Sequence, residues 1–302
     1  MSWLVLALIA LFCWSGSDFF SKLGSRPDDK YSHLKMVIAV GLVMGIHAVI
    51  LVATGNVKFT FSAIITYLPA SVLYIAAMVI GYITLRYIEL SLSSPVCNAS
   101  GAVAAVFCFV FLKQTIEGMN LIGVILVCAG VILLGVVEFT ENDEARALRQ
   151  EKSNVKYAKS FVAILLPIFY CLIDAAGTVA DTIILETLDE NVANVAYEFT
   201  FLFLGVLAAI YVYGIKREKA EIRRELPKLA GGVCETAGQL AYINAIAQYA
   251  VGAAPVISAY CMLSVIWSHI FLGEKLSWKH YATIAVVVAG IVVLGVAEGF
   301  AE

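Results

Sequence analysis

Ionisable and polar side chains recur at helical spacing inside stretches that are otherwise apolar. Glu235, Gln239 and Tyr242 are spaced i, i+4, i+7, and Trp14 and Asp18 are four residues apart. Residues at these spacings lie on one face of an α-helix. A carboxyl group in apolar surroundings binds a cation, takes up a proton or accepts hydrogen bonds. The spacing therefore predicts two helices whose polar faces could bind a polar solute or carry a proton.

A third polar face is predicted from Asp174, Thr178 and Asp181, and Asn98 adds an amide group near the start of another helix. An ionisable residue at the centre of a spanning helix costs about 2.5–3.5 kcal/mol on insertion scales, so it normally faces the protein interior or water. The polar faces are therefore expected to converge on a cavity. For Asp18 and Asp181, which lie toward helix ends, snorkelling to the membrane interface is an equally good interpretation.

The candidate solute-binding residues combine these polar groups with aromatic ones: Trp14, Tyr82, Asn98, Asp174, Glu235, Gln239, Tyr242 and Tyr260. Glu235, Asp174 and Asp18 are the candidates for carrying a coupling proton. The aromatic candidates have a second interpretation, because aromatic side chains in a bundle are more often packing residues. Glu198 is interpreted as a first-turn acid that interacts favourably with the helix dipole.

The composition is that of a membrane protein. Of the 302 residues, 61% are hydrophobic and 14% are charged, and the mean hydropathy is +0.90. Soluble domains have roughly 45–50% apolar and about 25% charged residues. The apolar residues form runs of about 20, long enough for a helix to cross a hydrocarbon core about 30 Å thick. We predict an all-α polytopic membrane protein with ten transmembrane helices, at about 3–22, 34–54, 61–85, 93–113, 119–138, 160–185, 193–214, 228–247, 253–272 and 279–298.

A long stretch occurs twice in the chain. Residues 94–138 and 254–298 align without a gap at a shift of 160 positions, which brings Pro95 onto Pro255. Pro, Gly and Glu residues recur in the same order in both copies, and such order is harder to obtain by chance than shared Val and Leu. The chain is therefore interpreted as an internal repeat. Each of the two prolines is expected at the start of its helix.

The charged segment 139–159 is the expected connection between two five-helix halves, 1–138 and 160–302. Because five is odd, the second half must enter the membrane with the opposite orientation. Inverted repeats are common in secondary carriers, whose substrate site lies near the midplane between the halves.

The charge distribution predicts the orientation of the chain. The side of the membrane that holds the N-terminus carries only two basic residues, Lys58 and Lys113, and the opposite side carries the other 18 of the 20 Lys and Arg. Cytoplasmic loops are enriched in Lys and Arg. We therefore expect a multi-pass protein of the cytoplasmic membrane with both termini on the extracytoplasmic side.

The closing stretch FLGEKLSWKHYATIAVVVAGIVVLG resembles the end of an EamA-type repeat of the drug/metabolite transporter superfamily. That repeat has Leu-Gly-Glu at a helix end, here 272–274, and a later helix ending Gly-x-x-x-x-Gly, here Gly290 to Gly295. The first half departs from the pattern at 113–114, where Lys-Gln replaces Gly-Glu, and the second half departs at Thr283. The resemblance implies a carrier of small metabolites or drugs that works by alternating access. Superfamily members are commonly drawn with both termini inside, opposite to the orientation indicated by the charges.

Other function classes have less support in the sequence. No HExxH or GxSG motif indicates an intramembrane enzyme, so the protein is not expected to be one. No metal-ligand cluster, nucleotide-binding signature or other cofactor motif is found, and no nucleic-acid partner is expected. We expect a secondary transporter of a small organic solute in a lipid bilayer, and the alternative is a channel or a sensory membrane subunit. A homodimer is left open.

Overall fold

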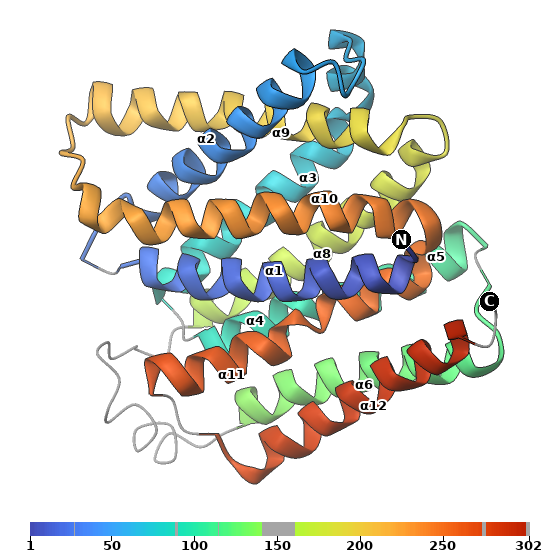
Figure 1. The fold of residues 1–302 in the computed structure, drawn as a ribbon. Helices are drawn as coiled ribbons and strands as arrows, with labels where there is room; N and C mark the ends of the chain where they lie inside the picture. The colour runs from blue at the N-terminus through green and yellow to red at the C-terminus, as the bar shows by residue number, and fades with distance from the viewer. Residues whose placement is uncertain (27, 88–89, 114, 141–160, 274–275, 300–302) are drawn as a thin grey trace.

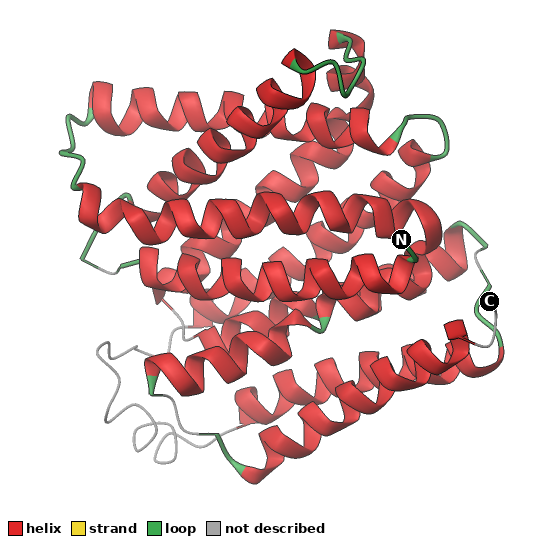
Figure 2. Cartoon of the chain, viewed as in Figure 1, coloured by secondary structure: helices red, strands yellow, loops and turns green. Residues whose placement is uncertain are grey.

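The computed structural model describes residues 1–26, 28–87, 90–113, 115–140, 161–273 and 276–299. Within these ranges every regular element is a helix (Figures 1 and 2). The predicted all-α fold is therefore confirmed. Most of the predicted connection 139–159 lies outside the described residues.

The helices follow one another with short connections. Their bounds are α1 Trp3–Gly24, α2 Ser32–Ala53, α3 Phe61–Tyr87, α4 Leu90–Asn98, α5 Ser100–Phe111, α6 Gly118–Thr140, α8 Phe161–Leu185, α9 Glu190–Ala209, the π-helix η1 Ile210–Ile215, α10 Ile222–Ser258, α11 Tyr260–Leu272 and α12 Trp278–Gly299.

Eight stretches of the described chain are long and apolar enough to cross a membrane. The last of them, Ile222–Leu272, has 51 residues, whereas about 20 suffice for one crossing. The backbone leaves helical geometry at Tyr249 (φ −160°, ψ 78°), inside α10. In Figure 1 the chain reverses direction within α10, so that the last part of α10 and then α11 run back. This stretch contains two of the ten predicted segments, and a shorter apolar helix at Trp278–Leu294 overlaps most of the tenth.

The helix bounds recur at the shift of 160 positions seen in the sequence. The break between α4 and α5 falls at Ala99, and the break between α10 and α11 falls at Ala259. The helix predicted at 93–113 is therefore interrupted. Pro95 and Pro255 lie inside α4 and α10, so the expectation that they open their helices was wrong.

Packing between the halves follows a reciprocal pattern. The first helix of each half packs against the third apolar segment of the other half, as α1 on α10 and α8 on α3. The pairs α2–α9 and α6–α12 each join a helix to its own counterpart. A Cβ on Gly290 would lie 2.8 Å from the Val127 backbone nitrogen, and one on Gly130 would lie 3.0 Å from the Val287 nitrogen. Glycine at these positions permits close contact between α6 and α12.

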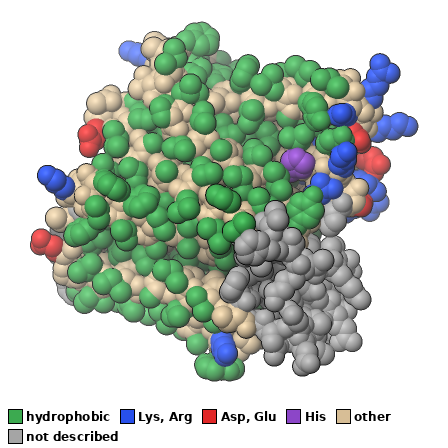
Figure 3. All heavy atoms as spheres, turned by 180° about the vertical axis from the view of Figure 1, so that it is seen from behind, with side chains coloured by type: hydrophobic (Ala, Val, Ile, Leu, Met, Phe, Trp, Pro, Cys, Tyr) green, Lys and Arg blue, Asp and Glu red, His purple; other side chains and the backbone are tan. Residues whose placement is uncertain are grey.

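The outer surface is suited to lipid. Large hydrophobic side chains cover the broad face in Figure 3, while Lys and Arg are concentrated at its edge, near the grey atoms. Among the described residues of the whole surface, Phe61, Ile65 and Phe203 are 83%, 74% and 65% exposed. Soluble monomers rarely expose contiguous apolar patches of more than a few hundred Å². The face is therefore a lipid-contacting surface, in agreement with the predicted multi-pass membrane protein.

Candidate functional site

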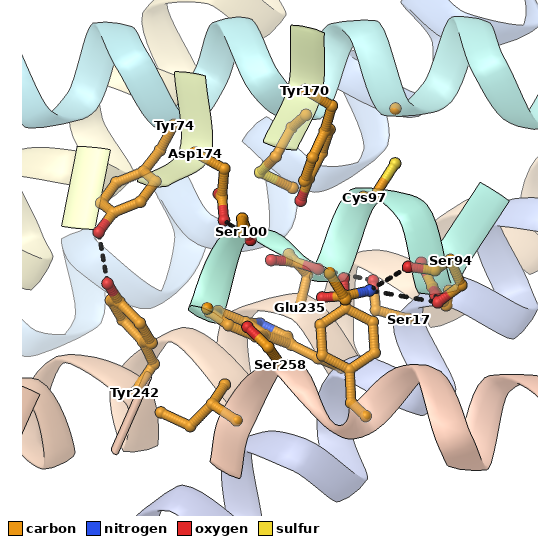
Figure 4. A pocket seen from close by; sticks show the side chains of 18 of the residues that line it. Ser17, Tyr74, Ser94, Cys97, Ser100, Tyr170, Asp174, Glu235, Tyr242 and Ser258 are labelled. Atoms are coloured by element: carbon orange, nitrogen blue, oxygen red, sulfur yellow. Dashed lines mark hydrogen bonds between the residues drawn. The ribbon is translucent and has the colours of Figure 1, made fainter. Parts of the chain in front are cut away.

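A cavity of about 90 Å³ lies inside the bundle, between the two halves. Its lining residues come from α1, α3, α4 and α5 of the first half and from α8, α9, α10 and α11 of the second. Figure 4 shows Asp174 and Glu235 reaching this space from different helices, with Tyr74 and Tyr242 bonded to each other at one side. The volume is sufficient for several water molecules.

The structure brings every candidate solute-binding and coupling residue to this one cavity. The residues are Trp14, Asp18, Tyr82, Asn98, Asp174, Glu235, Gln239, Tyr242 and Tyr260. The three polar helix faces therefore converge. The roles of these residues in binding and coupling stay predictions.

Hydroxyl groups hold the two carboxylates that come from α1 and α10. Ser94 Oγ donates to Asp18 Oδ2 at 2.5 Å, and Ser264 Oγ donates to the same oxygen at 2.9 Å. Ser17 Oγ donates to Glu235 Oε2 at 2.7 Å. Ser264 and Glu235 belong to the second half and their partners to the first, so the Ser264–Asp18 and Ser17–Glu235 hydrogen bonds link the halves, whereas the Ser94–Asp18 bond lies within the first half.

The carboxylate from α8 is held in the same way. Ser100 Oγ, at the start of α5, donates to Asp174 Oδ2 at 2.7 Å. This hydrogen bond also links the halves. Asn98 uses its amide group locally, donating to the Ser94 carbonyl oxygen at 2.8 Å. The amide thereby ties the end of α4 to the residue that holds Asp18.

Four polar atoms of the cavity residues are buried without a hydrogen-bond partner among the described residues. They are Trp14 Nε1, Ser21 Oγ, Tyr82 Oη and Gln239 Nε2. Buried polar groups are normally paired with protein or water, because an unpaired group loses its hydration without compensation. These atoms are therefore available to a solute or to water in the cavity.

A cluster around Asp181 adjoins the cavity at the Tyr74 side. Tyr67 Oη donates to Asp181 Oδ1 at 2.6 Å, and Tyr74 Oη donates to Asp181 Oδ2 at 3.4 Å. The Tyr74 hydroxyl is also bonded to that of Tyr242. Asp181 is fully buried, so the snorkelling interpretation was wrong for this residue.

Comparison with known proteins identifies the family. The sequence profile of the EamA-like transporter family matches residues 1–136 and again residues 161–296. The chain belongs to the EamA-like transporter family. The suspected resemblance is thereby confirmed, and the two matches correspond to the two halves. Membership in a transporter family is consistent with the expectation that the protein is not an enzyme.

Individual relatives add little on function. An uncharacterized protein of Methanocaldococcus jannaschii is 25% identical over 134 residues, which cover 44% of this chain and 96% of that protein. A solved structure titled "Crystal structure of protein" superposes with a TM-score of 0.66 at 14% identity, covering 99% of this chain and 98% of that one. This likeness shows a shared fold alone.

The serines that donate hydrogen bonds to the carboxylates were not among the site residues predicted from the sequence. Ser17, Ser94, Ser100 and Ser264 lie in apolar helices, where serine hydroxyls commonly bond across helix interfaces. That preference indicates an interior position. It does not indicate which carboxylate each serine contacts, because most of the partners belong to the other half.

Glu198 corrects another interpretation. Asp189 caps α9 by accepting from the backbone nitrogens of Asn191 and Val192, so the helix begins at Glu190 and Glu198 lies beyond its first turn. The carboxylate is fully buried and bonds to His47 Nδ1 at 2.7 Å, away from the cavity lining. Glu198 is therefore part of the α2–α9 contact and not a first-turn acid.

The described residues contain no group of three or more His, Cys, Asp or Glu side chains placed to hold a metal ion.

Proposed function

We propose that the protein is a secondary transporter that moves a small organic solute, such as a metabolite, an amino acid or a drug-like compound, across the cytoplasmic membrane by alternating access. The observation that carries the proposal is the cavity between the halves, in which each of three carboxylates bonds to a hydroxyl of the opposite half. A solute or proton that changes the bonding of such a carboxylate changes a contact between the halves.

The architecture that this mechanism needs is ten spanning helices in two inverted five-helix repeats. The recurrence of helix bounds at a shift of 160 and the reciprocal packing of the halves support it. In Figure 1, α6 begins beside the end of α12 and runs in the opposite direction, as expected for counterparts related by a two-fold axis in the membrane plane. Rocking of one half against the other would then expose the cavity to each side in turn.

Glu235, Asp174 and Asp18 are the proposed sites of coupling. A carboxylate that loses its proton inside the bundle must be stabilised by a donor or a cation, because an isolated charge in low dielectric is strongly unfavourable. The serine hydroxyls supply one or two hydrogen bonds, fewer than a carboxylate can accept. Protonation and solute binding are therefore alternatives at these groups.

The test is solute exchange by purified protein in proteoliposomes loaded with a metabolite mixture and followed by mass spectrometry. A transporter is expected to show saturable release that is accelerated when unlabelled solute is supplied on the opposite side. Release without saturation or counterflow would support a channel instead. No solute-specific release compared with protein-free liposomes would contradict transport and favour a sensory subunit.

Coupling is tested on the solute found in that assay. Glu235→Gln keeps the size of the side chain and removes its charge, so uptake driven by a pH gradient is expected to be lost while exchange without a gradient continues. Glu198→Gln is the matched control, since that carboxylate is buried outside the cavity lining. Unchanged gradient-driven uptake in Glu235→Gln would remove Glu235 from the coupling role.

A further inference from the structure

The charges around the cavity all have one sign. Asp18, Asp174 and Glu235 line it, and none of the described lining residues is Lys, Arg or His. A basic residue of α1, Lys22, lies one turn beyond Asp18, but its Nζ donates to the Leu85 carbonyl oxygen at 2.8 Å and it does not line the cavity. The electrostatic environment therefore favours a positive ligand and disfavours an anion.

The carboxylates have capacity left for such a ligand. Glu235 and Asp174 each accept one hydrogen bond from a neutral serine, although an ionised carboxylate can accept about four. Asp18 and Asp174 stay partly exposed where they line the cavity. Neutral donors supply no positive charge, so the carboxylates are without a cationic partner among the lining residues.

Aromatic rings form much of the remaining wall, contributed by one tryptophan and six tyrosines. The Trp14 ring lies 5.0 Å from the Tyr242 ring and 5.9 Å from the Tyr260 ring, centroid to centroid. The faces of such rings attract cations, most strongly when water is excluded. Quaternary ammonium groups in particular are bound by aromatic cages.

The unpaired donors suggest a second feature of the ligand. Trp14 Nε1 and Gln239 Nε2 are N–H groups without a partner among the described residues. An oxygen acceptor on the ligand would pair with them. The cavity therefore matches a cationic centre that carries a hydroxyl, ether or carbonyl oxygen.

We propose that the solute bound in the central cavity is a small organic cation, an amine or quaternary ammonium compound with an oxygen acceptor, held by Asp18, Asp174 and Glu235 against the Trp14 and tyrosine rings. This inference rests on the proposed function, because it names the chemical class of the transported solute.

Binding of three compounds of nearly equal shape tests the charge requirement. Choline is the cation, 3,3-dimethylbutan-1-ol its neutral isostere and 3,3-dimethylbutanoate a related anion, each added to purified protein at pH 8. Tetramethylammonium and benzyltrimethylammonium extend the cation series to smaller and larger sizes. Binding is measured by isothermal titration and by the rise in thermal stability that a ligand of the native state produces.

At least one cation is expected to bind at least tenfold more tightly than the neutral compound, and the anion is expected not to bind. Asp174→Asn and Glu235→Gln are each expected to weaken cation binding at least tenfold. Glu198→Gln removes a buried carboxylate outside the cavity and is expected to leave cation binding unchanged.

Three results would overturn the cation assignment: equal affinity for the cation and its neutral isostere, no binding of any of the three cations, or equal effects of Glu235→Gln and Glu198→Gln. Exchange of only neutral or anionic solutes in proteoliposomes would also overturn it, while leaving the transporter proposal intact. Conversely, cation binding without exchange of any solute would overturn transport and leave the cation site intact.

Discussion

At the scale of single residues, the buried carboxylates are held by neutral hydroxyl donors more often than by basic groups. Asp181 is an example, since it accepts from Tyr67 and Tyr74 and is fully buried. A hydroxyl can release a carboxylate without leaving a second charge behind, whereas separating an ion pair leaves two. Such bonds suit groups that change partners during a cycle.

Removing one of these donors tests how much the bond contributes. Tyr67→Phe takes away the closer of the two donors to Asp181, and loss of a hydrogen bond to a buried charged acceptor costs about 1–3 kcal/mol. We expect a lower midpoint of thermal unfolding in detergent. Tyr281→Phe is the matched control because Tyr281 is 53% exposed. Equal midpoints for the two variants would contradict the role assigned to Tyr67.

Outside the membrane-spanning segments, Asp29 provides a pH-dependent contribution. Partial burial raises the pKa of its carboxyl, but the Lys35 ammonium at 2.8 Å and the Tyr31 backbone nitrogen outweigh burial, so the pKa lies below its usual value. A carboxyl with a lowered pKa stabilises the fold above its unfolded pKa of about 3.9 and loses that contribution as pH falls through the folded value.

Asp29→Asn is therefore expected to lower the unfolding midpoint at pH 7 and to have a smaller effect below about pH 4. The measurement compares the midpoints of wild type and variant from pH 7 to pH 3. Asp28→Asn is the control, since the Asp28 side chain is 63% exposed and its carboxylate lies 3.8 Å from Arg224. A difference that does not depend on pH would show that Asp29 acts through packing alone.

Sequence spacing was sufficient to place the polar groups on faces and to bring them to one cavity. Glu235, Gln239 and Tyr242 line it as their i, i+4, i+7 spacing predicts. The hydrogen bond between Ser17 and Glu235 could not be predicted from the sequence, because the two residues are 218 positions apart and the pattern of one helix does not determine how the other is rotated. The burial of Asp181 could not be predicted for a related reason, because its tyrosine donors come from another helix, α3.

At the scale of helices, close packing of α6 on α12 depends on glycine. Gly290→Ala would place a Cβ 2.8 Å from the Val127 nitrogen and 2.9 Å from the Gly123 carbonyl oxygen. These are backbone atoms, so the helices must separate. We expect lower thermal stability, despite the higher helix propensity of alanine.

Gly214→Ala is the control for this substitution, because its Cβ would meet only an Ile210 methyl group, at 3.9 Å. It is expected to be neutral or slightly stabilising. If Gly290→Ala behaves in the same way, the contact between α6 and α12 is less close than described.

The helix boundaries show what periodicity can and cannot predict. All ten apolar segments overlap described helices, because about 20 consecutive apolar residues are a strong signal. The breaks at Ala99 and Ala259 have no such signal, since alanine is a good helix former. The helix predicted from residue 193 begins at Glu190, because the side chain of Asp189, a strong N-cap residue, caps it there.

At the scale of the whole molecule, the repeat shift and the charge asymmetry make one joint prediction. Asn56 follows α2 and Lys216 follows η1, and the two positions are equivalent under the shift of 160. Both are exposed. A parallel repeat would place them on the same side of the membrane, whereas an inverted repeat places them on opposite sides. The Lys and Arg distribution assigns Asn56 to the outside and Lys216 to the cytoplasm.

Single cysteines at these positions, in a variant without the seven native cysteines, distinguish the possibilities. A membrane-impermeant maleimide added to intact cells is expected to label Asn56→Cys, and to label Lys216→Cys only after the cells are opened. Labelling of Lys216→Cys alone would keep the inverted repeat and reverse the orientation, placing both termini in the cytoplasm. Labelling of both from outside, with an internal cytoplasmic cysteine protein still unlabelled, would contradict the inverted repeat. The alternating-access proposal would fail with it, because it requires two oppositely oriented halves whose rocking opens the cavity to each side of the membrane in turn.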